Sequence, residues 1–293
     1  MKKPHTISVF ECIYEGEEKE EKLLSVSRLN DEGKMLHREQ FDDEGNLIKK
    51  EENQYEGELV ALKREEDLIE NKITQTMCAY KDGKLVNQRD YLNDELLIEM
   101  IYAYNEDGKL IQNDILNNDG SANSSYSYEY LDRTTTEKFF DEEMTLVRMI
   151  ETVHDDDGQI VEKRITECYD DGDVVVSQNI EHKVVEGESI KNYYTNGEET
   201  HEVVECFDEQ GRIFQTITYD VAKDEESIAT MTYDERGNVT KEEITKDDEE
   251  ISVTVVKFDE YDNRVEMVVK SKLADDFYET STYKFVNEYN GEG

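Results

Sequence analysis

The segment Phe207-Asp208-Glu209-Gln210-Gly211-Arg212-Ile213 recurs, with changes, twice further along the chain. The copies are Tyr233-Asp234-Glu235-Arg236-Gly237-Asn238-Val239 and Phe258-Asp259-Glu260-Tyr261-Asp262-Asn263-Arg264-Val265, at spacings of 26 and 25 residues (233 − 207 and 258 − 233). In each copy an aromatic residue is followed by acidic residues, then by glycine or aspartate, and then by the start of an apolar segment. This order is typical of a tight hairpin turn in which glycine takes the positive-φ position.

Looser copies of the motif occur upstream, at residues 41–47, 80–85, 104–110, 154–160 and 193–197. Between the turns, apolar and polar residues alternate, as in the segment 251–255 (Ile-Ser-Val-Thr-Val), and this period of two indicates half-buried strands. The pattern predicts an all-β antiparallel meander of about twenty short strands, in a single array over residues 1–293. Because long sheets twist and one face here is apolar, we expect the sheet to curl into an open shell or a barrel-like form.

Two segments fit this pattern less well. Residues 58–73 place Leu59, Leu62 and Ile69 at helical spacing, so they are either a helix or a longer hairpin. The repeat is weakest over residues 117–139, where Ser121-Ala122-Asn123-Ser124-Ser125 is expected to form a flexible loop.

The net charge of −41 is the dominant feature of the composition. A field of this sign repels nucleic-acid phosphates and anionic membrane surfaces, and it favours basic protein partners. It also keeps a sheet-rich protein in solution, a role that needs no partner. We therefore expect neither a nucleic-acid nor a membrane partner. The composition does not indicate an oligomeric state.

The expected location is the bacterial cytoplasm. No apolar run is long enough to cross a bilayer, and no apolar segment of a signal peptide follows Lys2 and Lys3. The four cysteines, Cys12, Cys78, Cys168 and Cys206, show no Cys-x-x-Cys spacing and are expected as buried free thiols.

The turns resemble known repeats. The Tyr-Asp-Glu-Xaa-Gly-Asn turn at Tyr233, and its relative at Phe207, look like the YD repeats of the RHS family. The shorter forms at 80–85 and 193–197 are similar to the MORN-variant repeats of bacterial antitoxin-component proteins. The resemblance to RHS proteins implies a hollow shell wound around a toxin and a link to bacterial secretion, including type VI secretion. This chain is far shorter than an RHS shell and more acidic, which favours a small partner or accessory protein.

No motif for catalysis, a metal or a cofactor is present. The five histidines are scattered, no glycine-rich phosphate loop occurs, and acid pairs are too common here to indicate an enzyme. The acidic turns at 154–158 and 169–173 lack the ligand order of an EF-hand. We therefore take their carboxylates as candidate partner-binding residues: Asp155, Asp156, Asp157, Asp170, Asp171 and Asp173.

These observations predict a non-enzymatic protein-binding scaffold. We expect an immunity protein, or an adaptor or chaperone for a secreted bacterial toxin, that captures a basic effector on a concave, acid-rimmed sheet surface. Two alternatives stay open: an acidic mimic of nucleic acid, and a structural fragment of an RHS-like shell.

Overall fold

A computed structural model describes residues 3–15, 18–169, 172, 174–185, 187–247, 249–274 and 277–289. The regular structure in these residues is entirely β, and none of them forms a helix long and apolar enough to cross a lipid bilayer. The strands are β1 (Thr6–Glu15), β2 (Glu18–Leu29), β3 (Met35–Phe41), β4 (Leu47–Glu56), β5 (Leu59–Asp67), β6 (Lys72–Lys81), β7 (Lys84–Leu92), β8 (Glu95–Tyr104), β9 (Leu110–Asn117), β10 (Ala122–Leu131), β11 (Thr134–Phe140), β12 (Leu146–His154), β13 (Ile160–Glu167), β14 (Val174–Val185), β15 (Glu188–Thr195), β16 (Glu198–Phe207), β17 (Ile213–Asp220), β18 (Glu225–Tyr233), β19 (Val239–Lys246), β20 (Glu249–Phe258), β21 (Arg264–Ala274) and β22 (Phe277–Glu288).

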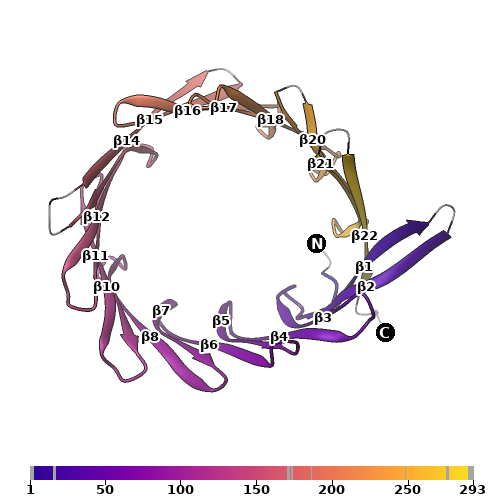
Figure 1. Cartoon of the computed structure of the whole chain (residues 1–293), viewed down its shortest axis with the longest axis horizontal. Helices are drawn as coiled ribbons and strands as arrows, with labels where there is room; N and C mark the ends of the chain where they lie inside the picture. The colour runs from indigo at the N-terminus through magenta and orange to yellow at the C-terminus, as the bar shows by residue number, and fades with distance from the viewer. Residues whose placement is uncertain are drawn as a thin grey trace.

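Each strand pairs antiparallel with the next along the chain, and β22 returns to pair with β1, so the 22-stranded sheet closes into a barrel (Figure 1). The predicted all-β, barrel-like meander is confirmed. Strands spaced about 4.8 Å apart and tilted by about 40° give a ring of this size a backbone diameter of about 44 Å. Contacts between elements occur only between adjacent strands, so none crosses the lumen in the described part of the chain.

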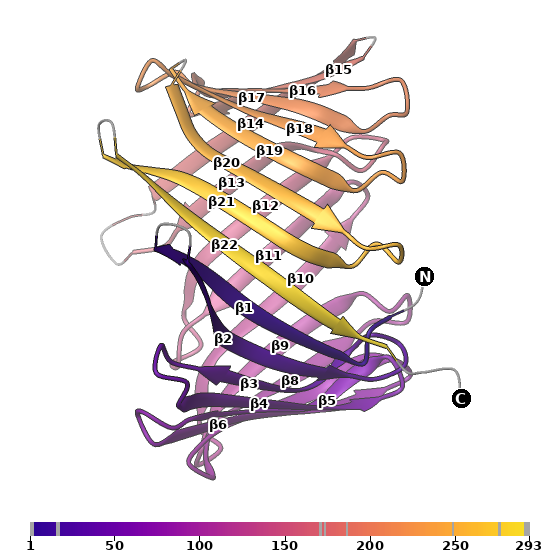
Figure 2. The same cartoon turned by 90° about the vertical axis from the view of Figure 1, so that its right-hand side faces the viewer.

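The two ends of the barrel are different. Both termini lie at one end (Figure 2), which we call the terminal rim; it also carries the turns that lead from even-numbered to odd-numbered strands. The turns from odd-numbered to even-numbered strands form the opposite rim.

The barrel has no packed core. Its accessible surface is 18867 Å², whereas a compact protein of 34.3 kDa exposes about 13,000 Å². Only Cys12 and Val256 are buried apolar residues among those described, and no large side chain is fully buried. The expectation of four buried thiols is therefore wrong for Cys78, Cys168 and Cys206, which are half-exposed.

The two faces of the sheet differ in exposure. In β8, Ile98, Met100 and Tyr102 are half-buried, whereas Leu97 and Ile101 on the other face are 48% and 41% exposed. Side chains on the concave side of a curved sheet converge, and those on the convex side spread apart. The face whose side chains are less exposed is therefore the inner wall. Residues paired across neighbouring strands lie on the same face, and this extends the assignment around the barrel.

The aspartate of the repeated motif organises the turn. In 234–238, Asp234 Oδ1 accepts the N–H groups of Arg236 and Asn238 at 2.9 Å each, and Gly237 has a φ of 89°. In the third copy Asp262 takes the glycine position with a φ of 63°, a conformation that aspartate tolerates. The Asn238 side-chain amide also donates to the Asp234 carboxylate. This hydrogen bond, together with those from the backbone N–H groups, holds the pKa of Asp234 below its ordinary value.

The aromatic residue of the motif joins neighbouring hairpins from the inner wall. Tyr233 donates its hydroxyl to the carbonyl of Ile213, 2.5 Å away, and the Arg212 guanidinium lies 4.4 Å from the centre of its ring. The same arrangement of a cation, the next carbonyl and a tyrosine occurs at Lys34–Met35–Tyr55, Lys84–Leu85–Tyr104 and Lys109–Leu110–Tyr130. We call this unit the tyrosine clasp. A β-bulge next to each carbonyl shifts the register of the adjoining ladder there.

The two segments that fitted the pattern less well are regular hairpins. Residues 58–73 form β5, a turn and the start of β6, with Asn71 at a positive φ of 52° in the turn. The loop expected at 121–125 is instead the start of β10, where the small side chains of Ser124 and Ser125 are buried. Ser125 donates a hydrogen bond of 2.6 Å to Asp114, which fixes it against β9.

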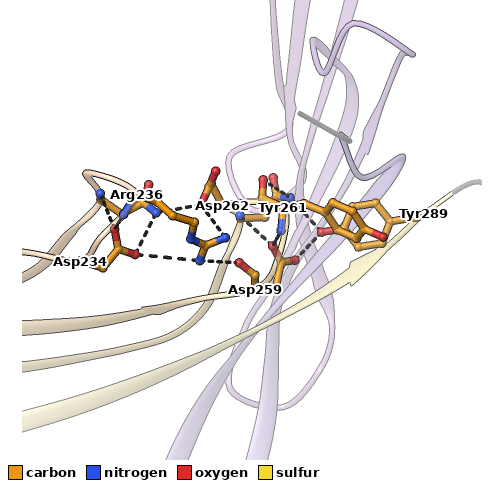
Figure 3. Close-up of polar contacts among 8 residues, drawn as sticks. Asp234, Arg236, Asp259, Tyr261, Asp262 and Tyr289 are labelled. Atoms are coloured by element: carbon orange, nitrogen blue, oxygen red, sulfur yellow. Dashed lines mark hydrogen bonds and ion pairs between the residues drawn. The ribbon is translucent and has the colours of Figure 1, made fainter.

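The seam between β1 and β22 closes the ring. Thr6 lies opposite Glu288 and Cys12 opposite Thr282, and Lys284 forms an ion pair of 3.0 Å with Glu21 of β2. At the terminal rim, Tyr289 follows β22 and packs its ring against that of Tyr261, with centroids 5.1 Å apart (Figure 3).

The turn that receives Tyr289 is part of a polar cluster. Tyr289 donates its hydroxyl to the Asp259 carboxylate, and Arg236 reaches the same turn, 2.8 Å from Asp262 (Figure 3). Burial and the hydrogen bond to Asp259 raise the pKa of Tyr289 to about 12. The neutral phenol therefore stabilises the folded end of β22.

This pKa predicts an alkaline weakening of the seam. An unfolded tyrosine titrates near 10, so the folded chain retains this proton to higher pH, and the stabilisation falls as the pH rises from about 10 to about 12. We expect the difference in Tm between the native chain and Tyr289→Phe to shrink over that interval in calorimetry. Other tyrosines affect both proteins equally; a constant difference from pH 8 to 12 would contradict the assignment.

Candidate functional site: the inner wall

The inner wall is the candidate functional surface, because it is concave and stays accessible from both rims. In the part of the chain that the structure describes, the inner wall is hollowed in sectors that include the following three. A hollow of 470 Å³ spans the seam and includes Val9, Arg38, Met267, Tyr283 and Phe285.

A second hollow, of 340 Å³, lies over β10 to β13. Tyr126 and Phe139 form one side, with ring centroids 4.8 Å apart, and Ile150 forms part of the floor. Arg148 and Glu167 pair at 3.0 Å across the neighbouring strands and line the same hollow. Aromatic surface beside a satisfied ion pair suits contact with a polypeptide.

The third sector covers β13 to β16 and holds two adjoining hollows of 300 and 190 Å³. Both are lined by Ile160, Ile180 and Tyr193. His182 lies on one side, where its Nε2 is 3.1 Å from Ser189 Oγ, and His201 lies on the other, edge-on to Tyr193 at 6.2 Å. Imidazole and phenol groups here can donate or accept hydrogen bonds around an apolar centre.

Some of the charges on the inner wall are paired with each other. Lys49 lies 2.8 Å from Glu65, and Lys191 lies 3.3 Å from Glu205. The ion pair with Glu65 raises the pKa of Lys49. The excess acid is instead displayed at the turns of both rims, for example at Asp31 and Glu106 on the terminal rim and Asp43 and Glu142 on the opposite one.

The predicted partner-binding acids are only partly placed by the structure. Asp155, Asp156 and Asp157 lie together in the turn from β12 to β13 on the terminal rim. Asp155 is structural, because its Oδ1 accepts the N–H groups of Asp157 at 3.0 Å and Gln159 at 2.8 Å. Asp156 is 93% exposed at its side chain and pairs with Arg133 at 3.1 Å. Asp170, Asp171 and Asp173 lie outside the described residues.

Within the described ranges, no group of three or more His, Cys, Asp or Glu side chains is placed to hold a metal ion. The sequence reasoning missed the aromatic and histidine residues of the inner wall. Their signal was the strand period itself: Ile180 and His182 are two residues apart on β14, and Lys191 and Tyr193 are two residues apart on β15. Parity along each strand would have grouped them on one face.

Comparisons with known proteins leave the family unassigned. No family model matches the sequence, and no curated protein matches it either. The resemblance of the turns to YD repeats therefore stays a prediction.

Several solved structures are similar to the chain. A porin-like protein from Bacteroides vulgatus ATCC 8482 is 11% identical with a TM-score of 0.33, over 69% of this chain and 98% of that one. A chain of TcdB2-TccC3-TEV is also 11% identical, with a TM-score of 0.34, over 98% of this chain. This chain spans 17% of that toxin chain. A porin-like protein from Bacteroides uniformis ATCC 8492 is 14% identical with a TM-score of 0.27, over 97% and 96%.

The two aspartates in the turn from β12 to β13 predict different responses to substitution. Asp155→Ala leaves two turn N–H groups without their acceptor, and we expect Tm to fall by about 2–4 °C, the effect of about 1 kcal/mol. Asp156→Ala removes an exposed ion pair and is expected to change Tm by less than about 1 °C. The Tm values of the two variants and of the native chain are measured by thermal unfolding, with circular dichroism as the signal. Equal effects would contradict the structural role of Asp155.

Proposed function

We propose that this protein is a non-enzymatic scaffold that binds another polypeptide on the inner wall of its barrel. The observation that carries the proposal is the open, aromatic inner wall of a closed ring with no packed core. A monomeric enzyme or structural domain of this size normally fills its interior with side chains. Here the apolar and aromatic side chains of the inner face remain within reach of a ligand.

The dimensions favour a segment of a protein as the occupant. Subtracting about 7 Å for side chains on each side of the 44 Å ring leaves a lumen about 30 Å wide. An α-helix is about 10–12 Å across, and a compact 100-residue domain has a radius of gyration of about 13 Å. The lumen therefore admits a helix, a hairpin or an extended segment with room for its side chains.

The charges favour a basic occupant that enters past the rims. Acidic turns attract a cationic chain and raise its rate of encounter, whereas the paired charges inside do not oppose its entry. Because the inner wall has no net cationic track, a nucleic acid is a poor fit. Aromatic side chains such as Tyr126 and Phe139 supply the central contacts.

Among basic polypeptides, we favour a secreted bacterial toxin, with this chain as its immunity protein or its adaptor. This part of the proposal rests on the resemblance of the turns to YD repeats. An immunity protein rescues cells that make the bound toxin, whereas an adaptor is required for the export of that toxin. Growth and secretion assays with the identified partner separate the two roles.

Neighbouring residues of β12 test the inner-wall proposal. A photo-cross-linking amino acid is placed at Ile150, which lines the hollow over β10 to β13, or at Met149, which faces outward from the same strand. In the cells that make this protein, irradiation is expected to join a basic polypeptide to position 150 and not to position 149. No adduct from 150, or equal adducts from both positions, would contradict binding inside the barrel.

A further inference from the structure

Strand β14 extends past its ladder with β13, and this part of the strand has a free edge. The strand runs from Val174 to Val185, but its ladder with β13 ends where Asn179 lies opposite Glu162. From there to Val185 it pairs only with β15. Residues 155–159 form the turn that leads into β13. This turn lies beside the free edge and makes no backbone hydrogen bond to it among the described residues.

The backbone groups on this edge point toward the gap. Asn196 donates its N–H to the Ser177 carbonyl at 2.8 Å, and Ser177 donates its N–H to Asn196 Oδ1 at 3.0 Å, so the backbone of Ser177 faces the β15 side. Backbone groups in a strand alternate in direction. Those of His182 and Val184 therefore face away from β15, and they offer two donors and two acceptors to an added strand.

A hollow beside the edge can receive a side chain. The 300 Å³ hollow on the inner wall lies between the turn residues Gly158 and Gln159 and the strand residues Ile180 and His182, with Tyr193 behind them. Its centre is apolar, with Ile160, Ile180 and Tyr193 as its walls. An extended segment paired with β14 would direct every second side chain toward this hollow.

Other strands also run past their ladders, as β6 does beyond Met77 and β10 beyond Ser127. There Tyr80 and Tyr130 donate to carbonyls across the gap, whereas His182 of β14 contacts Ser189 on β15. Strand β2 pairs with β3 only from Ser25 to Leu29, and its outer half reads Glu18-Lys19-Glu20-Glu21-Lys22. Charges of this density protect an edge against pairing with another chain. The free end of β14 carries Val184 and Val185 instead, which are 73% and 41% exposed.

We propose that the free edge of β14 binds an extended segment of the partner polypeptide by strand addition. This inference deepens the proposed function and rests on it, because it names where and how the partner binds. The segment carries an apolar residue that enters the hollow at Ile160, Ile180 and Tyr193. A basic residue follows toward the terminal rim, where Asp155, Asp156 and Asp157 form the adjoining turn.

Hydrogen exchange of single amides tests the edge without a ligand. In the isolated protein, we expect the amides of His182 and Val184 to exchange quickly and those of Glu181 and Lys183, which face β15, to exchange slowly. NMR detection resolves this alternation. Equal protection of all four amides would mean that the edge is covered, and it would overturn the inference whatever the fate of the proposed function.

A peptide probe tests strand addition directly. The probe is fluorescein-labelled Lys-Lys-Thr-Val-Thr-Val-Thr-Val, and binding is followed by fluorescence anisotropy. Val184→Pro removes only an N–H that faces the gap, a change that an edge strand tolerates, so its Tm should stay near the native value. We expect this variant to bind the probe about tenfold more weakly.

The same peptide with N-methylated valines is the matched control, because it cannot donate to an edge; we expect no binding. Native-like affinity of Val184→Pro, or no binding of the probe by the native chain, would overturn strand addition. Binding of the probe without a cross-link from position 150 would retain the edge site and count against a partner held in the lumen. The two proposals therefore fail separately.

Discussion

The pairing of β22 with β1 closes the sheet into a ring, and the shape of the whole molecule follows from it. A meander of this length that stayed open would have an unpaired edge at each end, and exposed edges promote association between chains. Closure pairs those edges with each other along Thr6 to Cys12 and fixes the number of strands around the ring. It also turns one face of the sheet inward, so it creates the concave wall on which the functional proposal depends.

Closure replaces the packed core that this composition cannot supply. With hydrophobic residues at 36% of the chain and charged residues at 37%, a compact arrangement would bury many carboxylates at high cost. The chain instead stabilises itself between neighbours, through ladders, Asp-centred turns and tyrosine clasps such as Arg212–Ile213–Tyr233. Stability of this kind is close to a sum of nearest-neighbour terms, as in repeat proteins. The lumen is then free for a ligand.

Local chemistry made much of the fold predictable. The turns at Phe207, Tyr233 and Phe258 were identified because glycine or aspartate at a positive φ is a local requirement, and the strand period followed from side-chain alternation. The segment 58–73 was ambiguous because Leu59, Leu62 and Ile69 satisfy a helical period as well as a hairpin. Serine-rich residues 121–125 were misread because the burial of Ser124 and Ser125 depends on neighbouring strands. Closure could not be predicted, since Thr6 and Glu288 meet only through the accumulated geometry of the whole array.

The candidate site was less predictable than the fold, for a related reason. Acidic turns are easy to recognise in a sequence, but the Asp155 carboxylate accepts hydrogen bonds from N–H groups within its own turn. The hollows of the inner wall combine residues such as Ile160, Ile180 and Tyr193 from separate strands. The free edge of β14 arises because its ladder with β13 ends early, at Asn179. No residue type in the sequence marks the end of that ladder. Strand parity would have grouped the inner-wall side chains, but register with neighbouring strands was also needed.

Small-angle X-ray scattering of the purified chain distinguishes a closed, hollow ring from a compact fold. A closed, hollow ring of about 44 Å backbone diameter has a radius of gyration of about 24 Å, whereas a compact protein of 293 residues has one of about 19 Å. We expect a monomer value near 24 Å and a distance distribution with the broad maximum of a hollow body. A value near 19 Å with a single compact peak would contradict the closed, hollow ring.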